Sequence, residues 1–152
     1  NLDLEEFIDH LKPYLKKENI SLESKDNLKE IISHLRTSSP TLASISQDLI
    51  PYFLDIKTYD QKSVDKFLIG SKPLLEFVLR QLESIEPWSE DQLDDVLAKC
   101  QKDLDLKTPQ LNQPIRVAVV GSTKSPSLGL TLSLIGKEVS IARIKKAIEF
   151  ND

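Results

Sequence analysis

Apolar residues recur every three or four positions through most of this chain of 152 residues. This spacing places them on one face of an α-helix. Glycine, which destabilises helix interiors, occurs only four times. The clearest example is residues 71–85, where one face would carry Leu74, Leu75, Val78, Leu79 and Leu82. The spacing predicts an all-α fold built from short helices.

Capping residues predict where these helices begin and end. Asp3 is suited to cap a helix within residues 2–17, which Pro13 is expected to end or kink. Ser39 and Pro40 would supply a cap and a first-turn proline for the next apolar run, residues 41–54. Similar signals are expected to open three later helices, at Ser89 with Gln92, at Ser125 with Pro126, and at Ser140.

A polar stretch over residues 55–63 interrupts the apolar pattern and indicates a boundary between two helical subdomains, 1–55 and 56–152.

Charge is distributed unevenly along the chain. Residues 113–152 hold six cations and three carboxylates, a net charge of +3. Because the whole chain has a net charge of −4, the first 112 residues carry −7. A basic end on an acidic body suits an anionic partner, although cations are also favoured near the end of a last helix.

The segment "QPIRVAVVGSTKSPSLG", residues 113–129, admits two interpretations. Its β-branched run before Gly121 resembles a strand leading into a phosphate-binding loop. Such a loop needs a second glycine directly before its lysine, and Lys124 has none. Alternatively, Asn112 caps a helix with Pro114 in its first turn and Gly121 at its end. Helical neighbours favour the second interpretation, with Ile115, Ala118 and Val119 packed inward.

Residues able to carry catalysis or bind metal are scattered. His10, His34 and Cys100 have no metal-ligand spacing, and no motif places a histidine beside Cys100. A single cysteine excludes an internal disulfide and fits a reducing compartment. No apolar run is long enough to span a membrane. The chain has no methionine, even at position 1, which favours a piece of a longer chain or a processed product.

Several ordered motifs resemble the C-terminal end of bacterial glutamyl-tRNA synthetases. That family typically has Gln-Pro-Leu-Arg before a hydrophobic run and glycine, then Ser/Thr-Pro-Gly-Leu, then Leu-Gly-Lys-Glu and a closing helix. Here the counterparts are "QPIRVAVVG", "SPSLG" and "LSLIGKEVSIARIKKAI", with "PWSEDQLDDVL" matching an upstream Trp-Ser/Thr-Glu element. The resemblance is specific from Trp88 onward.

The resemblance implies an all-helical cage of two subdomains in a class I aminoacyl-tRNA synthetase, with 1–55 as a connecting subdomain and 56–152 as the anticodon-binding subdomain. The family's enzymes ligate glutamate to tRNA in the cytoplasm with ATP and magnesium. Their catalytic motifs are not found here, so this chain is expected to bind tRNA as a monomer, with no cofactor and no aminoacylation.

Family motifs also imply which residues contact RNA. Carried over, the contacts to anticodon bases come from Arg116, Ser125, Pro126 and Leu128, with Lys124 in the same groove. An unpaired base can stack on an apolar surface while an arginine binds its edge. From the residues alone, Arg116 could instead form an interhelical salt bridge and Leu128 could belong to the core.

Upstream the sequence departs from the family, which often has an arginine that helps to read the third anticodon base. Ser38 stands at that position, and Arg36 lies two residues earlier. Either Arg36 reaches across or discrimination between glutamate and glutamine tRNAs is weak. A competing hypothesis, based on the acidic first 112 residues and the absence of a catalytic set, is a helical protein-interaction module without an RNA role.

Overall fold

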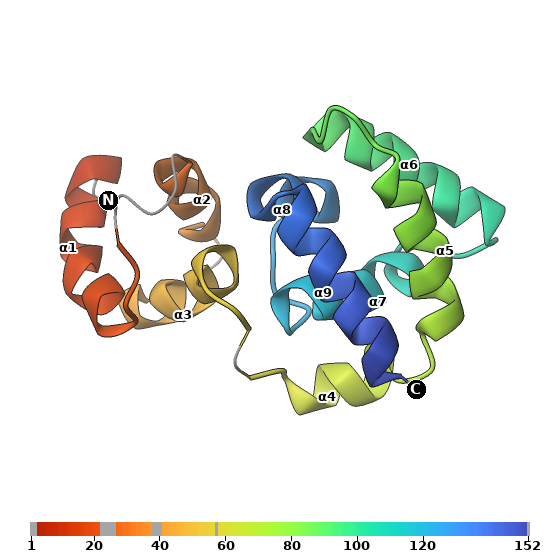
Figure 1. Cartoon of the computed structure of the whole chain (residues 1–152). Coiled ribbons are helices and arrows are strands. Elements are labelled where there is room, and N and C mark those ends of the chain that lie inside the picture. Colours follow the sequence, from red (N-terminus) through yellow and green to blue (C-terminus); the bar gives the residue numbers. More distant parts are fainter. Residues whose placement is uncertain (1–2, 22–26, 38–40, 57, 152) are drawn as a thin grey trace. The chain divides into compact units, whose positions relative to one another are not determined.

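The computed structural model of the chain describes residues 3–21, 27–37, 41–56 and 58–151. All the regular elements in these ranges are helices, which confirms the predicted all-α fold (Figure 1). The chain divides into two compact units, Asn1–Ile56 and Lys57–Asp152. The polar stretch that interrupts the apolar pattern contains this division.

The first unit contains, in its described residues, the helices α1 (Leu4–Lys17), α2 (Leu28–Leu35) and α3 (Leu42–Phe53). Their apolar stripes form its core, and α3 packs against both α1 and α2. Asp3 caps α1 as predicted, because its carboxylate accepts a 2.8 Å hydrogen bond from the Glu6 amide.

In this unit, one of the two outcomes expected of Pro13 is excluded, and the predicted cap of α3 needs correction. Pro13 does not end α1, which continues to Lys17. The proline removes one backbone donor, but Ile8, Leu11 and Leu15 are buried on the opposite side of the same helix and hold it in place. The cap of α3 is Thr41, whose hydroxyl accepts from the Ser44 amide at 3.0 Å. The predicted cap, Ser39–Pro40, lies outside the described residues.

The second unit begins with the short helix α4 (Gln61–Ser63) and the π-helix η1 (Val64–Leu68). Longer helices follow: α5 (Lys72–Glu83), α6 (Glu90–Asp103), α7 (Thr108–Val120), α8 (Leu128–Ile135) and α9 (Lys137–Phe150). Helix α9 packs against α5 and α7, while α6 packs against α8 (Figure 1). The buried faces of these helices form the core of the unit.

Gly129 lies where α8 approaches α6, and a Cβ atom added there would lie 3.4 Å from the Glu90 carbonyl oxygen. A Cβ atom at Gly129 would overlap the Asp94 carboxylate, so the two helices approach closely at that point. The indole of Trp88 fixes the same pair, since Nε1 donates a 2.8 Å hydrogen bond to the Leu132 carbonyl.

Three helix starts in this unit differ from prediction. Helix α7 begins at Thr108, so Pro114 lies inside the helix rather than in its first turn. Pro126 precedes the N-cap of α8, Ser127. Helix α9 begins directly after Gly136, and Ser140 is buried within it. Gly136 has a positive φ of 99°, which ends α8 and lets α9 start three residues before the predicted cap.

Candidate functional site

The segment that admitted two interpretations is a helix followed by a turn, as favoured above. Helix α7 ends at Gly121, whose φ of 85° is the left-handed conformation of a helix C-cap. Ile115, Ala118 and Val119 are fully buried, as predicted. Because these residues fix the rotation of α7, Arg116 lies at the edge of the core and half-buried. The connection 122–127 then leads to α8.

Arg116 bonds directly to that connection. Its Nε donates to Ser125 Oγ at 2.8 Å, and Nη2 donates to the Pro126 carbonyl at 3.3 Å. A third nitrogen, Nη1, donates to Gln113 Oε1 at 2.6 Å, one helical turn earlier in α7. The structure thus brings together three of the predicted site residues, and Gln113 orients the guanidinium between them.

Thr131 supports this cluster from α8. Its side chain is fully buried, and Oγ1 lies 3.1 Å from both Ser125 Oγ and the Pro126 carbonyl. Ser125 Oγ also donates to the Pro126 carbonyl at 2.9 Å. We call Gln113, Arg116, Ser125, Pro126 and Thr131 the Arg116 cluster. Two of its members, Gln113 and Thr131, were not predicted from the sequence, although Thr131 is a hydroxyl within the apolar run of α8.

Two further predicted residues flank the cluster. Lys124 is exposed on the turn, where its backbone amide donates to Ser122 Oγ at 3.2 Å. Leu128 is only 2% exposed, so its side chain belongs to the core and offers almost no surface to a base. Of the two interpretations of Leu128, the structure therefore places it in the core, where it anchors the first turn of α8.

The Arg116 guanidinium bonds to the turn itself, whereas the protein-interaction hypothesis would place this side chain in an ion pair remote from the turn. Its cationic group faces a turn with a serine, a proline and an exposed lysine. Such a surface can donate hydrogen bonds to a planar polar group and attract an anion.

A family model described as "Anticodon binding domain" matches residues 6–148. The chain belongs to the anticodon-binding domain family. The matched range includes the whole Arg116 cluster and extends over both units of the chain.

This anticodon-binding domain is similar to part of several glutamate–tRNA ligases. It is 30% identical to glutamate–tRNA ligase 2 of Thermoanaerobacter pseudethanolicus over 99% of the chain, and 34% identical to that of Syntrophotalea carbinolica over 89%. The chain spans 32% and 29% of the length of these two relatives.

Solved structures show the same fold. A glutamate tRNA ligase from Elizabethkingia meningosepticum, crystallised with its amino acid, superposes with a TM-score of 0.84 at 22% identity. The alignment covers 99% of this chain and 30% of that one. The synthetase from Elizabethkingia anophelis gives a TM-score of 0.78, also at 22% identity.

The two upstream candidates of the anticodon-binding domain belong to its first unit. The Arg36 guanidinium lies 4.7 Å from the centre of the Phe7 ring, a cation–π contact that holds the side chain against α1. Arg36 is half-buried. Ser38 lies outside the described residues.

The described residues contain no group of three or more His, Cys, Asp or Glu side chains able to hold a metal ion. Cys100 is 1% exposed, and desolvation raises the pKa of its thiol, which disfavours the thiolate needed of a nucleophile. His10 and His34 are exposed. Within the same ranges, no helix combines the length and apolar character needed to cross a membrane.

Proposed function

We propose that this anticodon-binding domain recognises the anticodon loop of a glutamate-accepting tRNA, as the C-terminal part of a glutamate–tRNA ligase. The observation that carries the proposal is the Arg116 cluster, which joins the two sequence motifs that resemble the family's base-contacting motifs. The named relatives, which are glutamate–tRNA ligases, align over 89–99% of the chain.

The chemistry of the cluster suits an unpaired base. RNA loops present bases that can be splayed out, stacked on an apolar surface and hydrogen-bonded along an edge. Pro126 supplies a half-buried apolar ring, and Arg116 and Ser125 supply polar groups beside it. Lys124 is exposed next to this surface and would meet a phosphate of the same loop. Gln113 and Thr131 act by positioning these groups.

Arg36 would contribute to reading the third anticodon base, with Ser38 at the position where the family often has arginine. Because a serine cannot replace an arginine fork, we expect weak discrimination between glutamate and glutamine tRNAs unless Arg36 supplies it. The complete ligase would be cytoplasmic and monomeric and would use ATP and magnesium, as the resemblance implies. The role of this chain in it is to hold the RNA.

The proposal is tested by measuring binding of the chain to a glutamate-accepting tRNA transcript and to transcripts with substituted anticodons. Salt must be fixed at a moderate concentration, because phosphate contacts make affinity strongly salt-dependent. We expect each substitution at a contacted base to weaken binding by about 1–3 kcal/mol, by analogy with bidentate base readout in DNA. Equal affinity for all anticodons would show that the domain does not read the anticodon.

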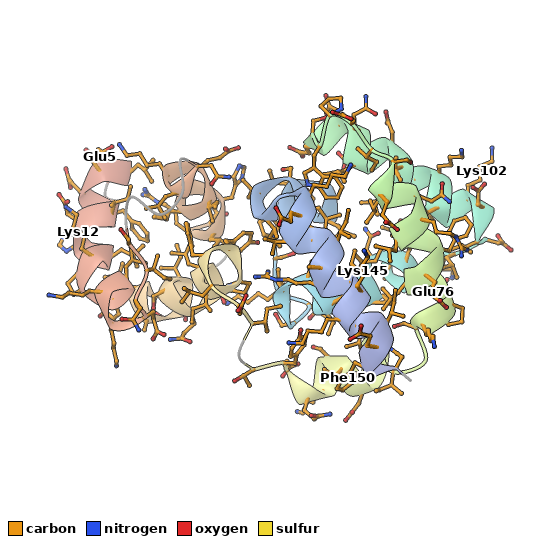
Figure 2. The ribbon with its side chains drawn as sticks, viewed as in Figure 1. Glu5, Lys12, Glu76, Lys102, Lys145 and Phe150 are labelled. Carbon is orange, nitrogen blue, oxygen red and sulfur yellow. The ribbon has the colours of Figure 1, made fainter. Side chains whose placement is uncertain are left out.

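Arg116→Ala and Lys145→Ala provide a matched pair of variants. Both remove one cation from the second unit, but Lys145 is exposed on α9 and has no place in the Arg116 cluster (Figure 2). Arg116→Ala should abolish anticodon preference, whereas Lys145→Ala should lower affinity slightly and equally for every transcript. If the two variants had similar effects, Arg116 would contribute to binding only through its positive charge and not by recognising a base.

A further inference from the structure

A pocket in the same unit has no role in the function proposed above. It has a volume of about 290 Å³ and lies between the segment 58–68 and the last turns of α9. Val64, Leu68 and Ala147 form its apolar part and are at most 3% exposed. Tyr59 and Phe150 line it as well, with Lys146 beside them. We call it the Tyr59–Phe150 pocket.

Several hydrogen bonds join the elements that line this pocket. Asn151 bonds through Nδ2 to the Ala147 carbonyl, and its Oδ1 accepts from the Gly70 amide, both at 2.8 Å. These bonds tie the end of α9 to the end of η1. The π-helical turn is closed by the Ile69 amide, which donates to the Val64 carbonyl at 3.0 Å. Single π-helical turns are rare and are often found at functional sites.

The two aromatic residues leave an apolar surface facing solvent. Phe150 is 60% exposed, the highest value among the large apolar side chains that the structure describes. Figure 2 shows its side chain at the end of α9, beside α4. Desolvation raises the pKa of Tyr59, so the phenol is neutral at neutral pH even though Arg143 opposes the shift. An aromatic pocket of this size accommodates a single planar ring system rather than a drug-sized ligand.

Lys146 is a cation that lines the pocket and would pair with a phosphate attached to that ring, although the Asp60 carboxylate follows Tyr59 directly in the sequence. Lys146 is exposed at the pocket, and Arg143 lies close enough to Tyr59 to affect its ionisation. Arg143 is itself held by a 2.7 Å hydrogen bond from Nη1 to the Val119 carbonyl of α7. Aromatic side chains with cationic neighbours are the usual components of single-stranded nucleic-acid sites, because every base can stack on them.

The pocket is also joined to the Arg116 cluster. The Asp60 amide donates a 2.8 Å hydrogen bond to the carbonyl of Gly121, the residue that ends α7 and begins the connection to Ser125. The backbone next to Tyr59 therefore contacts the start of the turn that carries Lys124 and Ser125. An RNA loop that occupies the turn could place a neighbouring unpaired base in the pocket.

We propose that the Tyr59–Phe150 pocket binds a second unpaired nucleobase of the RNA held at the Arg116 cluster. The ring would stack against Tyr59 or Phe150, whose side chains face solvent at the pocket, and Lys146 would contact the phosphate attached to that nucleotide. The inference rests on the proposed function, because it requires an RNA ligand for the same unit.

The test uses the full chain and an RNA hairpin with the anticodon stem and loop of a glutamate-accepting tRNA. Each unpaired base is removed in turn by an abasic substitution. We expect Phe150→Ala and Tyr59→Leu to weaken binding of the intact hairpin roughly 5- to 100-fold. Val139→Ala is the matched control, because Val139 is also an exposed apolar residue of α9, at 42%. Thermal unfolding checks that each variant folds.

Removing one particular base should weaken binding of the native chain as much as Phe150→Ala weakens binding of the intact hairpin. When the variant meets that abasic hairpin, its affinity should fall no further. The pocket proposal fails if Phe150→Ala matches Val139→Ala, or if the losses add at every abasic position. The first result would show that the aromatic surface of Phe150 does not contact the RNA. Arg116→Ala separates the two proposals: if it weakens binding while Phe150→Ala does not, only the pocket is excluded. If the intact chain does not bind the hairpin, both are excluded.

Discussion

Arg116 Nε donates a 2.8 Å hydrogen bond to Ser125 Oγ, which joins the middle of α7 to the turn before α8. The two residues are nine positions apart, and each lies in a motif that resembles the family's base-contacting motifs. Because a guanidinium has five N–H donors in a fixed plane, Arg116 can bond to several acceptors of the turn at once. It therefore determines the shape of the turn as well as its charge.

Replacing Arg116 with lysine should be nearly as damaging as replacing it with alanine. Lysine retains the charge but has no planar fork that can reach Gln113, Ser125 and Pro126 together. We expect Arg116→Lys to lower the affinity for tRNA about tenfold or more. Filter binding at fixed salt measures this, and an affinity close to that of the native chain would show that charge alone suffices.

Thr131→Val should weaken RNA binding without a contact between Thr131 and RNA. The variant keeps the shape of the buried side chain but removes the hydroxyl that supports Ser125 and the Pro126 carbonyl. Loss of this hydrogen bond should reduce the free energy of unfolding by about 1 kcal/mol, measured by urea denaturation. Thr131→Ser keeps the hydroxyl and should restore most of the RNA affinity. If serine and valine behave alike, the hydroxyl does not position the turn.

Gly121→Ala should destabilise the second unit. With φ at 85°, the position is left-handed, and a Cβ atom there costs about 1 kcal/mol. The Gly121 carbonyl also accepts a hydrogen bond from the Asp60 amide. Strain at Gly121 would therefore disturb both the turn that leads to Ser125 and the segment that contains Asp60. We expect a lower midpoint of thermal unfolding. Gly121→Asn is the control, since asparagine adopts this conformation more readily and should lose less.

Asp60 should make stability depend on pH in the acidic range. Hydrogen bonds from the Ser63 hydroxyl and then the Ser63 amide lower the pKa of the Asp60 carboxyl in the folded chain. Because this pKa is lower in the folded chain, the ionised carboxylate stabilises the folded state at pH values above the unfolded pKa of ~3.9. This stabilisation is lost as the pH falls through the folded pKa.

We therefore expect Asp60→Asn to unfold at a lower temperature than the native chain at neutral pH, with the difference shrinking toward pH ~3. Circular dichroism melts over that pH range measure the change. A difference that stays constant with pH would contradict the proposed role of the charge.

Much of the fold could be predicted from the sequence because apolar spacing and helix caps depend on residues only a few positions apart. The stripe of Leu75, Val78 and Leu82 in α5 is buried as its spacing indicates. Asp3 and Ser89 cap helices because their side chains accept from amides three residues later. Helix starts were predicted less well. Ser140 has the chemistry of a cap, but it lies inside α9 because Gly136 already provides the break between helices.

The candidate site could be predicted only in part. Resemblance to a family indicated Arg116, Ser125 and Pro126, which the structure joins by hydrogen bonds. Thr131 required the tertiary structure, because its bond to Ser125 depends on how α8 lies against the turn, whereas Gln113 bonds to Arg116 within α7, three residues away. Leu128 illustrates the same limit, since a leucine beside a binding turn can face either the RNA or the core.

The sequence alone determined that the chain is helical and which family its motifs resemble. Each of these properties depends on residues near one another in the chain. Only the tertiary structure decided that Arg116 bonds to the turn, that Leu128 is buried, and that Tyr59 and Phe150 share one pocket. Those outcomes depend on contacts between distant segments, which are formed when separate helices bury their apolar faces together.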